Sequence, residues 1–268
     1  MLTLISHIRN ESLLLPHWIA HHLPMVDAAT IIDYASTDDS LDIIRTLAPD
    51  WRIVRSQNVD FDANDADFEV MQIEWNTPGW KLALNTTEYL VAPNLRGLLH
   101  TAKAQGFQGL TGDSFVLADK DRLGMAGIRP GLPVLQQFHW GVHEDPAKGF
   151  TRRRLLHCWR TGSYSVGRHN WMRGPTAQST DLLYATLGYA PWDQAMIDRK
   201  LAIGQQISQH DRQRGLGAHH LRDAAALQRD FEAAAAAAVD LRLDPLWCRL
   251  LQMAQPLPLP LPLEPALA

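Results

Sequence analysis

The stretch AATIIDYASTDDSLDIIRTL, residues 28–47, contains a complete strand, turn and helix pattern. Residues 28–34 are apolar and β-branched, as in a buried strand, and residues 35–39 form a polar turn. The apolar residues that follow have the spacing of one helix face: Leu41, Ile43, Ile44 and Leu47. This segment therefore predicts a strand, a polar loop and an amphipathic helix in succession.

The same alternation occurs on both sides of this segment. Residues 2–8 form an apolar run, and apolar residues then recur at helical spacing over 13–22. Further along the chain, strands are predicted at 51–54 and 80–84, with a helix leading from the acidic stretch through 60–75. Sustained alternation of strands and helices predicts an α/β fold with a mixed, mainly parallel sheet flanked by helices, of the Rossmann-like type.

The second half of the chain is harder to assign from periodicity. A helix is predicted at 95–104, and residues 105–175 are irregular and rich in Gly, Pro, His and Trp. Long irregular regions inside a folded protein are often binding surfaces, so a binding surface is expected there. Two helical stretches follow at 181–204 and 218–239, the second with six consecutive alanines.

We therefore expect three parts in the chain. Residues 1–180 form the α/β domain, and residues 181–255 form a helical extension packed on it. Residues 256–268 alternate Pro with Leu, and because proline lacks an amide donor this part is expected to be an extended, mobile tail.

Composition limits the possible partners. A formal net charge of −4 argues against a nucleic acid as the main partner, because that affinity depends on cationic contacts with phosphates. Two cysteines, Cys158 and Cys248, are too few for a disulfide framework. No basic leader and no run of about 18 apolar residues occurs. We expect a cytoplasmic protein without a membrane span.

Three polar stretches follow predicted strands: residues 9–11, 33–39 and 85–88. In open α/β sheets, ligands bind beyond the carboxyl ends of the strands, where loops present backbone donors and short polar side chains. We expect these stretches to converge at one edge of the sheet.

These stretches lie in segments that resemble a known family. RNESLLLPHWIAHH (9–22), IIDYASTDDS (31–40) and GWKLALNTTEYL (79–90) resemble, in order and spacing, three signatures of family 2-like GT-A glycosyltransferases. These are an Asn-Glu loop after the first strand, a DNxSTD turn and a DxDE-type sequence. The resemblance covers residues 2–91 and implies a GT-A fold that binds a nucleotide diphosphate sugar. It also implies sugar transfer to a glycan or other acceptor.

The resemblance implies roles for individual residues. It implies that Arg9, Asn10 and Glu11 line the nucleotide and that Asp33 recognises the base or ribose. The third loop, near the donor phosphates, contributes Asn85, Thr87 and Glu88. Ser36 and Asp38 belong to the second motif, although helix capping alone also explains these two residues.

The third motif departs from the family pattern. Asn85 and Thr87 stand where the family has two aspartates for a divalent metal, and Glu88 remains as a single carboxylate. Because hard cations are held mainly by carboxylates, we expect no tightly bound cofactor. Three alternatives follow: metal-independent transfer, weak Mn²⁺ or Mg²⁺ binding through Glu88, or a catalytically inactive nucleotide- or glycan-binding homologue.

Metal-independent transfer requires cationic side chains at the departing diphosphate, for which Lys148 and Arg152 are the candidates. The run Arg152–Arg154 also fits a solvated face or a set of ion pairs.

The irregular region contains the other candidates. An acceptor hydroxyl needs a general base, for which Glu144 or Asp145 is proposed, although both also fit a polar turn before Pro146. His169 is a candidate for contact with phosphate or acceptor, and Trp140 for stacking on a sugar. A loop histidine and a packed tryptophan are the alternatives for these two residues.

Overall fold

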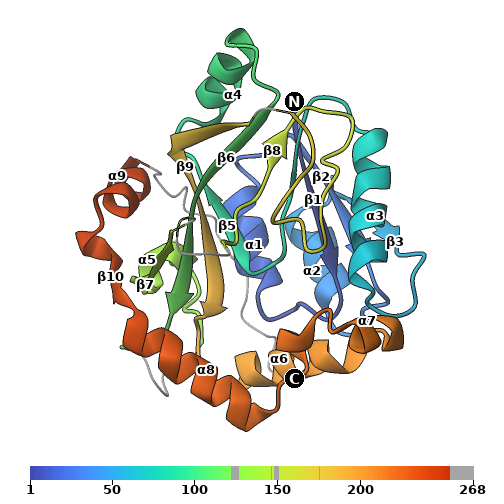
Figure 1. The fold of residues 1–268 in the computed structure, drawn as a ribbon, viewed down its shortest axis with the longest axis vertical. Helices are drawn as coiled ribbons and strands as arrows, with labels where there is room; N and C mark the ends of the chain where they lie inside the picture. Colours follow the sequence, from blue (N-terminus) through green and yellow to red (C-terminus); the bar gives the residue numbers. More distant parts are fainter. Residues whose placement is uncertain (122–126, 146, 148–150, 175, 254–268) are drawn as a thin grey trace.

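A ten-stranded mixed sheet organises the protein (Figure 1). The computed structural model describes residues 1–121, 127–145, 147, 151–174 and 176–253. Lys148 and the 256–268 segment lie outside the described residues, and so do the predictions made for them. The helices of the described ranges include none long and apolar enough to cross a membrane.

The N-terminal half of the sheet is parallel, in the order β3-β2-β1-β4. Its strands are β1 (Leu2–Ile8), β2 (Ala28–Asp33), β3 (Arg52–Arg55) and β4 (Trp80–Ala83). β1 pairs along its length with β2 and β4, so that Ile8 lies beside Asp33 and Ile5 beside Ala83. All four carboxyl ends therefore lie at the same edge.

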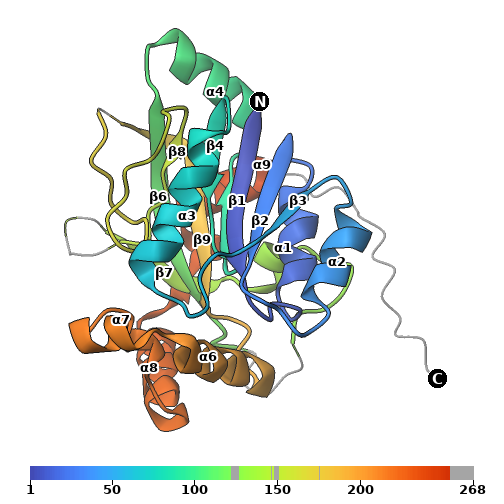
Figure 2. The same ribbon diagram turned by 90° about the vertical axis from the view of Figure 1, so that its right-hand side faces the viewer.

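Helices cover both faces of this parallel part (Figure 2). α1 (Leu15–His22) and α2 (Ser40–Leu47) lie on one face, and α3 (Ala63–Trp75) lies on the other. Alternate residues of β1 follow the same division: Leu4 belongs to the main core, whereas Ile5 packs in a separate core with Val70 of α3. Burial on both faces explains why apolar residues of β1 point to both sides of the sheet, as the consecutive Leu4 and Ile5 do.

The second half of the sheet is largely antiparallel. Its strands are β5 (Glu88–Val91), β6 (Gly109–Ala118), β7 (Trp140–Glu144), β8 (Leu156–His157), β9 (Ala177–Tyr189) and β10 (Val239–Asp240). β8 joins the two halves, because it is antiparallel to both β4 and β6. β9 lies between β5 and β6, antiparallel to the first and parallel to the second. The helices here are α4 (Leu95–Ala104) and the short α5 (Val134–Gln137).

The C-terminal helices follow β9, and the last of them packs against that strand. They are α6 (Gln194–Gln206), α7 (Gln209–Arg214), η2 (Ala218–His220), α8 (Ala224–Ala237), η3 (Leu241–Leu243) and α9 (Pro245–Met253). In Figure 2, α6, α7 and α8 lie together past the ends of β1 and β2, whereas α4 lies at the opposite end of the molecule. The C-terminal helices α6 and η2 are thereby placed at the edge where the three polar loops end.

The α/β, Rossmann-like fold expected from the sequence is confirmed by this topology. The helix predicted over 181–204 is wrong in its first half, because residues up to Tyr189 form strand β9 and the helix begins at Gln194. Leu182 to Ala185 are completely buried between two strands, so tertiary pairing decides their conformation. The expected boundary at residue 180 falls inside β9.

The region 105–175, for which no strand was predicted, contains the long strand β6. The two glycines of GLTGDSFVLA, residues 109–118, weaken a strand pattern. A Cβ at Gly112 would lie 2.1 Å from the carbonyl oxygen of Leu182, so close approach of β9 requires glycine there.

Candidate functional site

The loops that follow β1 and β2 are joined by hydrogen bonds. The backbone N–H of Asn10 donates to Oγ of Ser36 at 3.1 Å, and that of Ser12 donates to Oδ2 of Asp38 at 3.0 Å. Asn10 in turn accepts from the backbone N–H of Thr37 at 2.7 Å through its Oδ1. The side chains of these two motifs thus hold each other's backbone.

The loop after β4 joins the same assembly. The Thr86 hydroxyl donates to Oε2 of Glu11 at 2.8 Å, and both groups are buried. The expected convergence of the three polar stretches at one sheet edge is therefore confirmed.

Backbone strain is concentrated around this edge. Asn10, Ala35 and Arg168 have φ values of 55°, 61° and 60°, in the left-handed region that side-chain-bearing residues rarely adopt. Such conformations persist only where their surroundings enforce them, and they are frequent at ligand sites.

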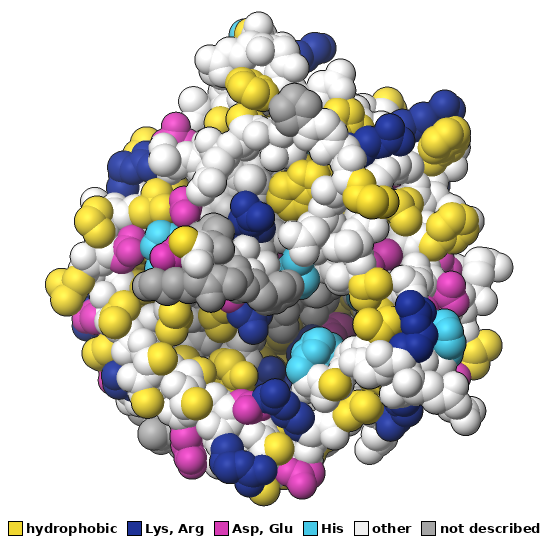
Figure 3. All heavy atoms as spheres, viewed as in Figure 1, with side chains coloured by type: hydrophobic (Ala, Val, Ile, Leu, Met, Phe, Trp, Pro, Cys, Tyr) yellow, Lys and Arg dark blue, Asp and Glu magenta, His cyan; other side chains and the backbone are white. Residues whose placement is uncertain are grey.

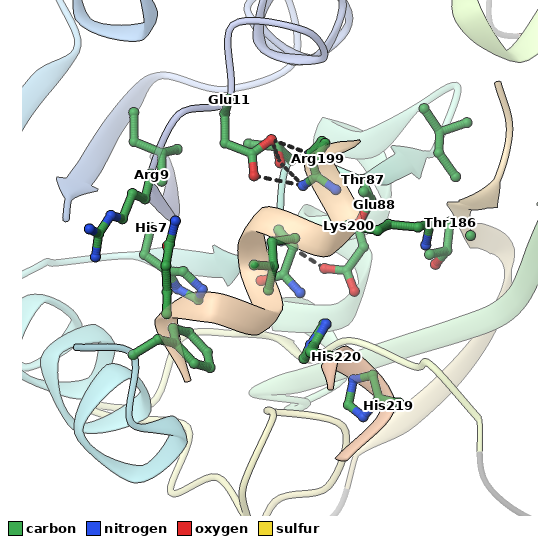
Figure 4. A pocket seen from close by; sticks show the side chains of 18 of the residues that line it. His7, Arg9, Glu11, Thr87, Glu88, Thr186, Arg199, Lys200, His219 and His220 are labelled. Atoms are coloured by element: carbon green, nitrogen blue, oxygen red, sulfur yellow. Dashed lines mark hydrogen bonds and ion pairs between the residues drawn. The ribbon is translucent and has the colours of Figure 1, made fainter. Parts of the chain in front are cut away.

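A cavity of about 400 Å³ opens at this edge (Figure 4). In Figure 3, histidine and Lys or Arg side chains border a hollow on the face viewed. Its walls come from the loops after β1 and β4, the end of β9, and the C-terminal segments α6 and η2. The parallel sheet and the C-terminal helices thus both contribute to this cavity.

Glu88 is fully engaged by a buried arginine. Arg154 binds both carboxylate oxygens, with Nε 2.8 Å from Oε2, and the backbone N–H of Asn85 also donates to Oε2 at 2.8 Å. The side chains of Glu88 and Arg154 are 3% and 1% exposed. A metal ion at Glu88 would have to displace Arg154 from a buried ion pair.

Glu11 is engaged in a similar way by the C-terminal part of the chain. Nε and Nη2 of Arg199, on α6, donate to its two oxygens at 2.9 and 2.6 Å (Figure 4). The next residue on α6, Lys200, also lines the cavity. This ion pair fixes the start of the cavity wall that α6 provides.

Lys200 differs from these arginines because no carboxylate within the described ranges lies at ion-pair distance from its ammonium group. Its Nζ lies 5.1 Å from the ring centroid of Tyr189. Burial, followed by the charges of Arg199 and Arg152, lowers the pKa of Lys200 to about 8. The cavity therefore contains a cation that is poorly solvated and has no carboxylate counterion among the described residues, which favours an anionic ligand.

The cavity histidines are held neutral. Burial and the nearby Arg154 lower the pKa of His169 to about 2, and burial and His219 lower that of His220 to about 3. Burial also lowers the pKa of His219, and the pKa of His7 lies well below its ordinary value for the same reason. Neutral imidazoles donate and accept hydrogen bonds but are weak bases here.

Three aromatic rings line one end of the cavity. The ring centroid of His7 lies 6.0 Å from that of Tyr34 and 5.6 Å from that of Phe61. These side chains come from β1, the end of β2 and the segment before α3, and their rings are inclined to one another by 46–68°. Together they provide an aromatic patch against which a ring can pack.

The structure brings about half of the sequence-predicted residues to the cavity. Those that line it are Arg9, Glu11, Asn85, Thr87, Glu88, Arg152 and His169. The described residues that do not line it are Asn10, Asp33, Ser36, Asp38, Trp140, Glu144 and Asp145.

Asp33 shows why part of the second motif does not reach the cavity. Its Oδ1 accepts from the backbone N–H of Ser36 at 2.9 Å, and its Oδ2 lies 3.6 Å from the exposed guanidinium of Arg55. Tyr34, the next residue, lines the cavity instead. Asp38 likewise accepts from the backbone N–H groups of Ser12 and Ser40.

The proposed bases lie on the outer strand β7 and in the turn after it. Glu144 binds the guanidinium and the backbone N–H of Arg152, and also accepts from Ser114 Oγ at 2.7 Å. Asp145 is exposed and accepts from the backbone N–H of Ala147. Trp140 donates its indole N–H to Asp121. Two members of the arginine run, Arg152 and Arg154, thus form ion pairs. Ion pairing was one of the alternatives given for this run from the sequence.

The sequence did not identify most of the basic residues on the C-terminal side of the cavity. The cavity residues Arg199, Lys200, His219, His220 and Arg222 lie in the C-terminal helical region, and Arg154 and Arg168 lie behind the loop after β4. Adjacent charged residues on a helix usually form a solvated face, so their sequence carries no distinguishing signal.

Comparisons with known proteins do not identify a family for this chain. No family model matches the sequence, and no curated protein matches it. Among solved structures, glucosyl-3-phosphoglycerate synthase from Mycobacterium tuberculosis, in complex with Mn²⁺, UDP and glucosyl-3-phosphoglycerate, is similar at 16% identity and a TM-score of 0.32. That match covers 42% of this chain and 44% of the other. A mycobacterial protein matches at 13% identity with the same TM-score, over 43% and 41% of the two chains. The chain thus spans less than half of these structures.

Proposed function

We propose that the cavity binds a nucleotide diphosphate sugar and that the protein transfers the sugar to a hydroxyl of a glycan or other acceptor. The observation that carries this proposal is Lys200, a cation in a cavity at the carboxyl edge of parallel strands. Within the part of the chain that the structure describes, it has no carboxylate partner. In this proposal Lys200 contacts the diphosphate, and no tightly held metal ion is needed.

The charges around the cavity support this assignment. Two carboxylates that line the cavity, Glu11 and Glu88, are neutralised by Arg199 and Arg154. A diphosphate therefore meets no free carboxylate from these two residues, and it supplies the counterion that Lys200 lacks. Arg9 and Arg152 also line the cavity and are proposed as further phosphate contacts.

The nucleoside is proposed to lie against the rings of His7, Tyr34 and Phe61. A base ring stacks favourably on aromatic side chains regardless of its identity. This position replaces the contact with Asp33 that the family resemblance implies, because both oxygens of Asp33 face other protein groups. His169 remains a candidate for contact with phosphate or acceptor because it lines the cavity.

The proposed transfer breaks the bond between the anomeric carbon and the diphosphate oxygen and forms a bond to the acceptor oxygen. The leaving diphosphate gains negative charge at the broken bond. Preorganised cations near that oxygen stabilise the transition state. In this proposal Lys200 and the guanidinium groups have the role that a carboxylate-bound metal ion has in the family. Glu144 and Asp145 remain predictions for the base.

Calorimetric titration of the full chain with UDP and with GDP tests the proposal. The protein is first treated with EDTA, and each titration is run in EDTA and again with Mn²⁺. We expect saturable binding of at least one nucleotide in EDTA, with an affinity that Mn²⁺ changes by less than about threefold, since Glu88 is paired. Absence of binding, or binding that requires Mn²⁺, would contradict the proposal.

A second function, nucleotide binding without transfer, is favoured by one observation. Glu11, Glu88 and Glu144 each have their carboxylate in an ion pair, and the pKa of His169 is too low for an efficient base. Incubation with UDP- or GDP-sugars, followed by assay for released nucleotide diphosphate with and without glycan acceptors, distinguishes the two. Turnover supports the transferase, whereas binding with no turnover for any donor supports the binding protein.

A further inference from the structure

A cluster of two carboxylates and one imidazole lies behind the cavity wall. Asp62, His210 and Asp211 each present one potential ligand atom, and these atoms lie within 4.8 Å of one another. Asp62 immediately precedes α3, whereas His210 and Asp211 lie in the first turn of α7. The cluster therefore brings together segments about 150 residues apart in the chain.

One oxygen in this cluster lacks a partner. Asp211 is 1% exposed and uses Oδ2 to accept from the backbone N–H of Ala63 at 2.7 Å. Its Oδ1 is buried and accepts no hydrogen bond from the described residues. A buried carboxylate oxygen without a donor is costly, so this atom indicates a missing positive partner.

The charge of the cluster indicates the same. Asp62 is 8% exposed and accepts from two backbone N–H groups, from Ser208 and from His210 Nδ1 at 2.9 Å. Across the described ranges, no Lys or Arg forms an ion pair with either carboxylate. The nearby Arg212 donates to the carbonyl oxygens of Ile207 and Gly204 instead. Among the described residues, the imidazole of His210 is thus the only side chain in an ion-pair contact with these two close, poorly hydrated carboxylates.

We propose that Asp62, His210 and Asp211 bind one divalent transition-metal ion, with Zn²⁺ as the preferred ion. One imidazole and two carboxylates suit Zn²⁺, whereas Mg²⁺ and Ca²⁺ prefer oxygen ligands alone. The dication neutralises both carboxylates and supplies the partner that Asp211 Oδ1 lacks. Water completes the coordination.

The site is accessible and needs only small adjustments. The side chain of His210 is 63% exposed, so an ion reaches the cluster from solvent. Ligand atoms around a tetrahedral Zn²⁺ lie about 3.4 Å from one another. Two ligand atoms of the cluster that are 4.8 Å apart would therefore have to approach each other by about 1.4 Å. Rotation of the exposed imidazole and of the carboxylates provides this movement. The hydrogen bond between His210 and Asp62 is exchanged for bonds to the ion.

An ion here connects the two regions that form the cavity. Phe61 and Gln206, which both line the cavity, are joined by a backbone hydrogen bond of 2.9 Å, and Ser208 donates to the Phe61 carbonyl at 2.8 Å. The proposed site lies directly next to these bonds. Bound Zn²⁺ therefore stabilises the attachment of α6 and α7 to the parallel half of the fold.

Zn²⁺ binding to the EDTA-treated full chain, measured by competition with a chromophoric chelator, tests the proposal. We expect one Zn²⁺ per chain in the wild type and a Tm that rises to a plateau as Zn²⁺ is added. His210→Gln is expected to weaken binding at least about tenfold, since it removes one ligand. His210 is exposed, so this variant is expected to fold. Asp211→Asn, which keeps the acceptor for Ala63, is expected to weaken binding similarly.

His100→Gln is the matched control, because it removes another exposed histidine, on α4. The double variant His219→Gln/His220→Gln tests the cavity histidines as an alternative site. Both are expected to retain wild-type affinity. Absence of Zn²⁺ binding in the wild type, wild-type affinity in His210→Gln, or loss of binding in the cavity double variant would each overturn the proposal. No nucleotide is used, so failure here leaves the proposed transferase function unaffected.

Discussion

The cavity is built from two regions whose polar side chains are used differently. In the loops after β1, β2 and β4, polar side chains bind each other's backbone, as Asp38 does with Ser12 and Glu88 with Asn85. On α6 and η2, by contrast, Lys200 has no carboxylate partner in the described chain, and His219 and His220 are neutral side chains on the cavity wall. The loops use their polar groups to fix the edge of the sheet, and the helices leave polar groups available to a ligand.

The region that resembles a known family is thus not the region that provides the cation proposed to bind the ligand. The resemblance to GT-A glycosyltransferases covers residues 2–91, which include all four strands of the parallel half of the sheet. Lys200, which has no carboxylate partner in the described chain, lies far outside that region. We infer that the N-terminal motifs mainly position the backbone and that the C-terminal helices select for negative charge.

The largest expected effect concerns the buried ion pair. Arg154→Met leaves Glu88 as a buried carboxylate without its counterion, so the free energy of unfolding should fall by about 3–5 kcal/mol. Urea denaturation followed by circular dichroism measures this change. Arg45→Met, which removes an exposed pair with Asp42, should cost no more than about 1 kcal/mol. Similar small losses in both variants would mean that the motif loops do not depend on Arg154.

The next effect is a pH dependence of nucleotide affinity. The protonated form of Lys200 binds the diphosphate, and its pKa in the free protein is about 8. Affinity for UDP should therefore lose the contribution of Lys200 as pH rises above 8, by up to about tenfold per pH unit until the raised pKa of the complex is reached.

Calorimetric titrations from pH 6.5 to 10 measure this profile. UDP itself titrates in this range, so the comparison is the difference between wild type and Lys200→Met. That difference should be constant below pH 8 and decrease above it. A constant difference up to pH 10 would contradict the assignment of Lys200.

Removal of Lys200 also has a predicted effect on stability. The folded-state pKa lies below the unfolded value, so the charged lysine disfavours folding at pH below about 8, and this penalty is relieved as pH rises toward 10.5. Lys200→Met should therefore raise the free energy of unfolding at pH 7 by about 1–2 kcal/mol, allowing for partial solvation. Urea denaturation of both proteins at pH 7 and pH 10 measures the stability gain of the variant and its decrease with rising pH. A variant less stable than the wild type at pH 7 would contradict the prediction.

The smallest effect is expected at Asp33. Asp33→Asn keeps Oδ1 as the acceptor for the Ser36 N–H and removes only a long contact with the exposed Arg55. We expect UDP affinity to change by less than about threefold and the free energy of unfolding by less than about 1 kcal/mol. A tenfold loss of affinity would show that Asp33 reads the nucleotide, as the family resemblance implies.

The sequence predicted the parts of the fold that local patterns determine. Strands β1, β2 and β4 and helix α4 were found from apolar spacing, and the three polar stretches were placed at one edge because parallel strands share it. Strands β6 and β9 were missed, since they are specified by pairing with each other across about 70 residues. Their glycines and mixed apolar runs fit several conformations equally well.

The candidate site was predicted less well than the fold. Asn85, Thr87 and Glu88 were identified because a motif follows a strand, but the partner of Glu88, Arg154, is 66 residues away in sequence. Lys200 follows an arginine on an ordinary helix. Its environment arises from how α6 packs against the sheet, which no local pattern encodes.

The central claim, that the C-terminal helices supply the charge that binds the diphosphate, is tested most directly by comparing two lysine variants. The measurement is UDP affinity by calorimetry at pH 7 in EDTA. Lys200→Met should weaken binding about 10- to 100-fold, because a charge-assisted contact is lost. Lys103→Met, on the distant helix α4, should bind within about twofold of the wild type. Equal affinity of the Lys200→Met variant and the wild type would contradict the account.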